Sequence, residues 1–331
     1  MARSILPLGC LAASSLLCSA GFAFQASAVN VAASVTPQFK LEASAGAVRV
    51  PQALLRVDSS LVLIPAHVTT AEGTSVMNLT KENFQLFEEG VEQKITHFTR
   101  DDAPISIGLL LDTSGSMENK MRKSSEAAAR FIKTANADDE FFLVEFNERP
   151  KLTVPFTPDS DLIFRRIAHT RPFGRTSLLD AIHLAMVQMK NAHNLRKAIV
   201  ILSDGGDNRS RFTSSEVKND MLESDVQLYA MGVFDQDDLH KHPIEEQNGP
   251  VLLDQLAEQT GGRLFTVGDL NELESISTRI SNELRNEYLL GYSPTNDSRD
   301  GKYRRVKLKL NAPDMPNLRT NYRHGYYAPE Q

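Results

Sequence analysis

The fold class is indicated most clearly by one stretch of the sequence, Ile105-Ser106-Ile107-Gly108-Leu109-Leu110-Leu111-Asp112-Thr113-Ser114-Gly115-Ser116. Its apolar run, from Ile105 to Leu111, ends abruptly at the carboxylate of Asp112. A continuous apolar run without polar alternation predicts a strand that is buried on both faces. Such strands occur in parallel sheets that carry helices on either side, so the sequence indicates an α/β protein.

The same pattern returns further along the chain, where the apolar run from Ala198 to Leu202 ends in Ser203-Asp204. Helically spaced apolar residues separate the two runs, and further strands and helices follow them. The predicted strands are 141–146, 152–156, 226–234 and 263–267, and the predicted helices are 119–135, 178–190, 252–259 and 270–286. This alternation predicts a doubly wound, mostly parallel, Rossmann-like α/β domain over residues 104–286.

The two flanks of this domain have a different pattern. Residues 53–103 and 287–331 contain short apolar runs broken by glycine turns, without helical spacing. Neither segment holds enough strands to bury a face alone, because an isolated hairpin is marginally stable in water. We therefore expect the segment 53–103 to pair with the segment 287–331 in one small β-sandwich.

The N-terminus resembles an export signal. Arg3 precedes a largely apolar stretch, Ile5 to Phe24, and the motif Ala26-x-Ala28 fits a signal peptidase site. A membrane anchor is the alternative, but Ser, Gly and Cys dilute the stretch and no charged flank follows it. The sequence predicts a signal peptide over 1–28, a flexible segment over 29–52, and an exported protein, periplasmic or extracellular, without stable membrane insertion after cleavage.

Composition excludes several classes of function. The only two cysteines, Cys10 and Cys18, lie in the predicted signal peptide, so the remaining chain has no thiolate for catalysis or for zinc. The chain is 41% hydrophobic and 24% charged, which is ordinary for a globular protein. Its formal net charge of -6 argues against nucleic acid as a partner.

Oxygen-bearing side chains collect where the apolar strands end. Asp112 and Asp204 each follow a predicted strand, Ser114 and Ser116 share one turn with Asp112, and Thr176 lies just before a predicted helix. Ligands of open parallel sheets bind beyond the carboxyl ends of the strands. Hard oxygen ligands suit Mg²⁺, Mn²⁺ or Ca²⁺ rather than zinc or copper. Two carboxylates and three hydroxyls leave coordination positions open for water or for a partner's oxygen.

These residues resemble the metal-ion-dependent adhesion site of the von Willebrand factor type A family, which is Asp-x-Ser-x-Ser, a distant Thr and a distant Asp. The resemblance covers the central domain and rests on three motifs: Asp-Thr-Ser-Gly-Ser-Met (112–117), Arg-Thr-Ser-Leu-Leu-Asp-Ala (175–181) and Leu-Ser-Asp-Gly-Gly-Asp-Asn (202–208). The flanks are similar to those of bacterial, acidobacterial-type members. The resemblance implies one divalent cation, Mg²⁺ first, bound by Asp112, Ser114, Ser116, Thr176 and Asp204. It also implies that this cation grips an exposed Asp or Glu of a protein partner.

Other interpretations of single residues stay open. Ser114 or Ser116 alone fits a helix cap, and Asp204-Gly205 alone fits a turn. Phe173 and Arg175 are candidates for partner contact, or for ordinary loop packing and solvated charge. We read the neighbouring Asp207 and Asn208 as turn residues and Asp180 as a helix-face residue, rather than as ligands.

Catalysis is not expected. The chain has no Gly-x-Ser-x-Gly, His-Glu-x-x-His or Gly-x-x-x-x-Gly-Lys-Ser/Thr motif, and no base accompanies the serines. Two alternatives to a binding module remain, namely a scaffold in which the ion pins the strand ends, and a metal-dependent hydrolase.

Overall fold

The computed structural model describes residues 61–100, 103–233 and 249–330. All of these residues lie in one compact unit, 57–331. The predicted signal peptide (1–28), the predicted flexible segment (29–52) and the first residues of the predicted β segment lie outside the described residues. Across the three described ranges, every helix is too short or too polar to cross a membrane.

The centre of the fold is a six-stranded sheet with the order β10-β9-β8-β5-β6-β7. Neighbouring strands are parallel, except that β7 runs antiparallel to β6 at one edge. The strands are β5 (Ile105–Asp112), β6 (Glu140–Phe146), β7 (Pro150–Thr157), β8 (Arg196–Ser203), β9 (Val226–Gly232) and β10 (Arg263–Thr266). The predicted α/β class with a mostly parallel sheet is confirmed.

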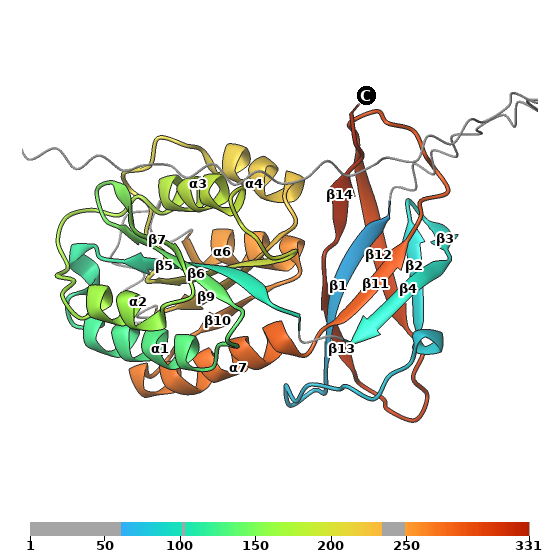
Figure 1. Cartoon of the computed structure of the whole chain (residues 1–331), viewed down its shortest axis with the longest axis horizontal. Coiled ribbons are helices and arrows are strands. Elements are labelled where there is room, and N and C mark those ends of the chain that lie inside the picture. Colours follow the sequence, from blue (N-terminus) through green and yellow to red (C-terminus); the bar gives the residue numbers. More distant parts are fainter. Residues whose placement is uncertain (1–60, 101–102, 234–248, 331) are drawn as a thin grey trace, which may run out of the picture. The chain divides into compact units, whose positions relative to one another are not determined.

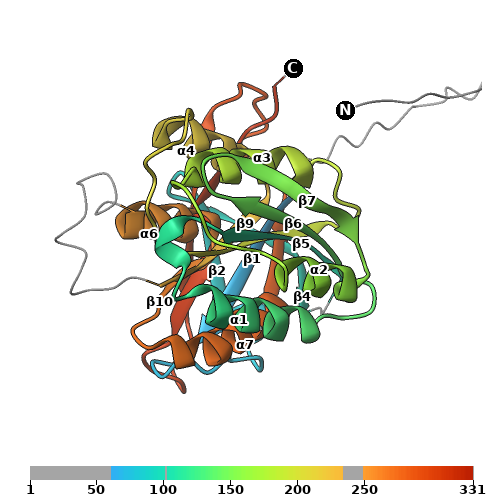
Figure 2. The same cartoon turned by 90° about the vertical axis from the view of Figure 1, so that its left-hand side faces the viewer.

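Helices cover both faces of this sheet (Figure 1). One face carries α1 (Met121–Lys133), α2 (Ser160–Ile167) and α7 (Leu273–Arg285). The other carries α3 (Leu178–Met189), α4 (Ser214–Glu223) and α6 (Gly249–Thr260), and the view in Figure 2 shows the sheet between the two helical layers. The 3-10 helices of the described residues are η1 (Lys81–Asn83), η2 (Gly115–Met117) and η4 (Leu270–Glu272).

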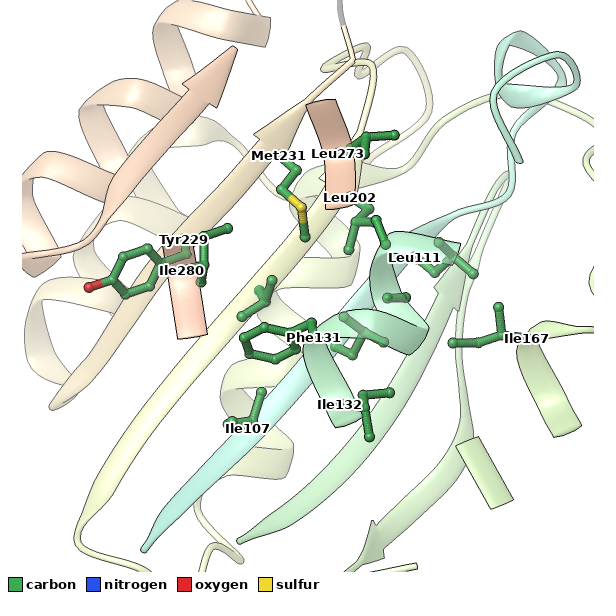
Figure 3. Close-up of a cluster of buried hydrophobic side chains, with 14 of the residues drawn as sticks. Ile107, Leu111, Phe131, Ile132, Ile167, Leu202, Tyr229, Met231, Leu273 and Ile280 are labelled. Atoms are coloured by element: carbon green, nitrogen blue, oxygen red, sulfur yellow. The ribbon is translucent and has the colours of Figure 1, made fainter. Parts of the chain in front are cut away.

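The apolar run from Ile105 to Leu111 is buried along its whole length. Leu109 and Leu111 of β5 pack into the core beneath α1 and α7, whereas Leu110 between them packs into the core beneath α3 and α6. Figure 3 shows the first of these cores, in which Phe131 and Ile132 of α1 gather with Leu111. Successive side chains of a strand point to opposite faces, so two apolar faces require a continuous apolar sequence.

Gly108 of β5 leaves room for the side chain of its cross-strand partner, Phe142 of β6. A Cβ atom at Gly108 would lie 2.3 Å from Cζ of Phe142 on β6. The Phe142 ring therefore fills the space that a side chain at position 108 would need, and the ring packs edge-on against Phe156 of β7, with centroids 4.9 Å apart.

The flanking segments form two further sheets, with the orders β13-β1-β11-β4 and β14-β12-β2-β3. Their strands are β1 (Val62–Thr69), β2 (Phe84–Glu88), β3 (Val91–Gln93), β4 (Ile95–Arg100), β11 (Tyr288–Tyr292), β12 (Tyr303–Leu310), β13 (Arg319–Tyr322) and β14 (Gly325–Tyr327).

Each of these sheets mixes strands from both ends of the described chain. Ala66 of β1 pairs with Tyr288 of β11, and Leu86 of β2 pairs with Leu308 of β12. Buried side chains of both sheets share one hydrophobic core. These pairings support our proposal that the segments 53–103 and 287–331 build one sandwich.

Candidate functional site

The candidate site begins where two adjacent strands of the central sheet end. Asp112 is the last residue of β5, and Asp204 follows Ser203, the last residue of β8. The chain passes from β5 to β6 on one side and returns later to β8 on the other, so this edge is the topological switch point. The Ser203 hydroxyl donates to Oδ2 of Asp112 at 2.6 Å, which fixes the fully buried carboxylate against the end of β8.

The turn after β5 places the two candidate serines beside Asp112. The Ser114 amide donates to Oδ1 of Asp112 at 2.9 Å, and the Ser114 and Ser116 hydroxyl oxygens lie 3.0 Å apart. Ser114 is buried, whereas Ser116 is exposed. One short turn thus presents a carboxylate and two hydroxyls, and the outer hydroxyl faces solvent.

The loop that carries Thr176 is tied to this turn through the backbone. The Gly115 amide donates to the Gly174 carbonyl at 3.0 Å, and the Phe173 amide donates to the Thr113 carbonyl at 2.9 Å. Gly174 has a φ of 78°, in the left-handed region that favours glycine. A Cβ atom there would also lie 2.9 Å from Cγ of Glu148, so glycine lets this loop pack closely against the Glu148 side chain.

Thr176 itself is held from the far side by the loop that follows β8. Its amide donates to Oδ1 of Asn208 at 3.0 Å, and the Asn208 amide donates back to the Thr176 carbonyl at 3.1 Å. The Thr176 side chain is buried, while Phe173 is 63% exposed and Arg175 is exposed. The structure therefore joins the loops of all five predicted ligands at one edge of the sheet, with Phe173 and Arg175 on the outer surface of one of them.

Two acidic residues near the site, Asp180 and Asp207, stabilise the conformation of the loop after β8 through hydrogen bonds. Oδ1 of Asp180 accepts the Arg211 and Phe212 amides at 2.7 Å and 3.1 Å. Oδ1 of Asp207 accepts the Ser210 amide at 3.2 Å, and burial raises the pKa of Asp207. Both carboxylates thus have structural partners that account for their positions.

The site is short of positive charge. Burial, and then the charge of Asp204, raise the pKa of Asp112 to about 7, against the opposing effect of its hydrogen bonds from Ser114 and Ser203. Among the residues that the structure describes, the ammonium bonded to these carboxylates is that of Lys120, whose Nζ lies 3.1 Å from Oδ2 of Asp204. When both carboxylates are ionised, they and the Lys120 ammonium carry a net charge of -1, which a cation would offset.

Three residues of this network were missed from the sequence as contributors to the site: Ser203, Asn208 and Lys120. Ser203 was visible as the hydroxyl residue beside Asp204. Asn208 was read only as a turn residue, and its contact with Thr176 spans 32 positions. Lys120 contacts a residue 84 positions away, and nothing in its local sequence indicates that contact.

Residues 107–206 match the family model of the von Willebrand factor type A domain. This chain contains a von Willebrand factor type A domain. Domains of this family generally mediate protein–protein interaction or adhesion, and they often bind a divalent metal ion.

Two curated relatives and one solved structure illustrate how far the similarity extends. An uncharacterized protein of Borreliella burgdorferi is 24% identical over 199 residues, which cover 54% of this chain and 57% of that protein. Inter-alpha-trypsin inhibitor heavy chain H2 of Homo sapiens is 25% identical over 212 residues, which cover 57% of this chain and 21% of that protein. A von Willebrand factor type A structure from Catenulispora acidiphila has a TM-score of 0.48 at 12% identity and covers 73% of this chain and 75% of that chain. The chain therefore spans 57% and 21% of the lengths of the two curated relatives.

Proposed function

We propose that this protein is an exported, metal-dependent binding module that grips a carboxylate of a partner protein through one divalent cation. The observation that carries the proposal is the convergence of three segments at the switch point of the sheet: the turn of Asp112, Ser114 and Ser116, the loop of Thr176, and the end of β8 before Asp204. The proposed ligands are Asp112, Ser114, Ser116, Thr176 and Asp204. We propose Mg²⁺ as the ion, with Mn²⁺ or Ca²⁺ as alternatives.

The donor chemistry of the site fits such an ion. Within the described ranges, no group of three or more His, Cys, Asp or Glu side chains could hold a metal, so a nitrogen- or sulfur-rich site is not available there. An ionised carboxylate has about four lone-pair positions. Each oxygen of Asp112 accepts one hydrogen bond and so retains capacity for a cation.

The bound ion could accept a partner's carboxylate because the protein would fill only part of its coordination sphere. Mg²⁺ takes six oxygens at about 2.0–2.1 Å and keeps several water ligands in most proteins. A partner's Asp or Glu would replace one such water and gain a charge-assisted contact. An isolated carboxylate is a weak ligand in water, so the loops around the ion must supply further contact. We assign Phe173 as an apolar contact and Arg175 as a second cation for the acidic partner.

We further propose that the module is not catalytic. The neighbouring acids Asp180 and Asp207 are engaged with backbone amides, and the lysine at the site is paired with Asp204. No side chain in the described part of this network is thereby placed as a free general base. Partner capture, rather than hydrolysis, is the activity that the arrangement supports best.

Partner binding should depend on the ion and on Thr176. Proteins captured from a native extracellular fraction in Mg²⁺ are expected to be released by EDTA. For a partner identified in this way, Thr176→Ala is expected to weaken affinity by about tenfold or more, because a lost metal ligand typically costs at least 1–2 kcal/mol of binding.

Thr278→Ala provides the matched control, since the Thr278 hydroxyl donates to the backbone carbonyl of Glu274 within α7. Replacing the partner's own Asp or Glu residues by Asn or Gln identifies the carboxylate. Binding that is unchanged by EDTA and by Thr176→Ala would favour the scaffold alternative, in which the ion stabilises the fold but plays no part in capture.

Metal affinity should also fall as the pH falls. The pKa of Asp112 is raised to about 7, so a proton and a cation compete for the same carboxylate near neutrality. With a pKa near 7 the ionised fraction changes about tenfold between pH 6 and pH 8, and affinity should follow it. Calorimetric titration with Mg²⁺ at each of these two pH values measures the change in metal affinity. Equal Mg²⁺ affinities at the two pH values would contradict the assignment of Asp112 as a metal ligand.

A further inference from the structure

Lys120 is the one cationic side chain bonded to the carboxylates of the candidate site in the described part of the chain. Its Nζ lies 3.1 Å from Oδ2 of Asp204, and the two side chains are 20% and 10% exposed. The pair is therefore shielded from solvent on most sides. An ion pair in such surroundings is less screened than one on an open surface.

The position of Lys120 in the fold is unfavourable for a cation. Lys120 is the N-cap residue of α1, and its side chain makes no capping hydrogen bond. Helix N-termini favour Ser, Thr, Asp or Asn at this position and acidic residues in the first turn. The first turn of α1 has no acidic residue, and it contains two further basic residues, Arg122 and Lys123. Helix stability therefore does not explain this lysine, whereas its contact with Asp204 does.

We propose that Lys120 is a tethered counter-cation that neutralises Asp204 in the metal-free protein and opposes the divalent ion, so that it sets the metal affinity of the site. This inference rests on the proposed function. A divalent ion bound by Asp204 would lie close to the ammonium, and the two like charges repel each other. The flexible four-carbon stem of lysine allows the ammonium to move toward solvent when the ion binds.

A purely structural ion pair would have different consequences. If the pair only held α1 against β8, its loss would destabilise the protein equally with and without metal. A counter-cation instead stabilises the metal-free state alone, so its loss destabilises that state and tightens metal binding. The two roles are separated by measuring affinity and stability together.

The experiment uses the full chain with Lys120→Met, with Lys120→Gln, and with Lys123→Met as the matched control. Lys123 lies on the same helix and pairs with Glu126, so its replacement removes an equal charge without touching Asp204. Calorimetric titration with Mg²⁺ and with Mn²⁺ gives the affinities, and thermal unfolding in EDTA and in saturating Mg²⁺ gives the stabilities. Lys120→Gln keeps a hydrogen-bond donor, so it serves if Lys120→Met does not fold in EDTA.

We expect both Lys120 variants to bind Mg²⁺ about tenfold more tightly than the parent protein, equivalent to about 1.4 kcal/mol. They should unfold at a lower temperature than the parent in EDTA and at the same temperature in saturating Mg²⁺, and Lys123→Met should match the parent. Equal or weaker Mg²⁺ binding by folded Lys120 variants would overturn the inference and leave the metal site standing. No Mg²⁺ or Mn²⁺ binding by the parent or by any variant would instead overturn the metal site itself.

Discussion

Mg²⁺ at one hundred times its Kd is expected to raise the free energy of unfolding by about 2.7 kcal/mol, because the ion binds the folded protein and not the unfolded chain. Asp112→Ala should abolish this gain. Asp112 is the fully buried carboxylate of the site, and both of its oxygens are held in place by hydrogen bonds from Ser114 and Ser203. Asp204, the other proposed carboxylate ligand, is already paired with Lys120 and does not replace it.

Chemical unfolding with and without Mg²⁺ measures this gain, and the comparison is made within each variant. That design matters because Asp112→Ala also changes the stability of the metal-free protein. Asp314→Ala makes the same substitution at an exposed position between β12 and β13 and should retain the full gain. An equal Mg²⁺-dependent shift in Asp112→Ala and in the parent protein would remove Asp112 from the site.

Replacing Arg304 by methionine is expected to destabilise the protein by about 3–5 kcal/mol, because the substitution leaves a buried charge without its counter-ion. Glu88 is 3% exposed and Arg304 is 4% exposed in the sandwich, and Nη1 of Arg304 lies 3.4 Å from Oε1 of Glu88. The hydroxyls of Tyr292 and Tyr326 both donate to the other oxygen of Glu88 at 2.8 Å. These neutral donors would remain in the variant and could not balance the charge.

The next residue along the strand provides the control for this prediction. Arg305 pairs with Glu89 on the surface, where the two side chains are 77% and 43% exposed. Arg305→Met should therefore cost less than about 1 kcal/mol. The double variant Arg304→Met/Glu88→Gln should recover part of the loss, because it removes both buried charges. Similar small effects of Arg304→Met and Arg305→Met in urea unfolding would show that the Glu88 pair does not hold the sandwich together.

The fold class could be predicted because a strand that is buried on both faces needs a continuous apolar sequence, which is visible without the structure. All eight residues from Ile105 to Asp112 are buried, and the apolar run marks them as a strand with helices on both sides. The antiparallel direction of β7 is indicated only by the length of the connection that precedes it. Only residues 147–149 separate β6 from β7, and so short a connection permits an antiparallel pair but not a parallel crossover.

Among the described helices, α2 and α4 were not predicted, although their capping signals were present. Asp159 accepts the Asp161 and Leu162 amides at the start of α2, and Thr213 forms a capping box with Glu216 at the start of α4. Both helices are short, at 8 and 10 residues, so their apolar spacing is a weak signal.

The candidate ligands could be selected from the sequence because each one follows a strand or precedes a helix. Their electrostatic setting could not be predicted. The contact of Lys120 with Asp204 and that of Ser203 with Asp112 join residues 84 and 91 positions apart. Such contacts depend on strand order, and strand order is not encoded in any local pattern.

The pairing of β4 with β11 has a consequence for how the protein can be altered. Arg100, at the end of β4, is the direct partner of Tyr288, at the start of β11. The whole α/β region connects β4 to β11, two adjacent antiparallel strands of the sandwich, at the position where a hairpin loop would otherwise join them. Insertions are tolerated where the two attachment points lie close together. We therefore expect that a tight turn, or another domain with neighbouring termini, can replace the α/β region at this junction.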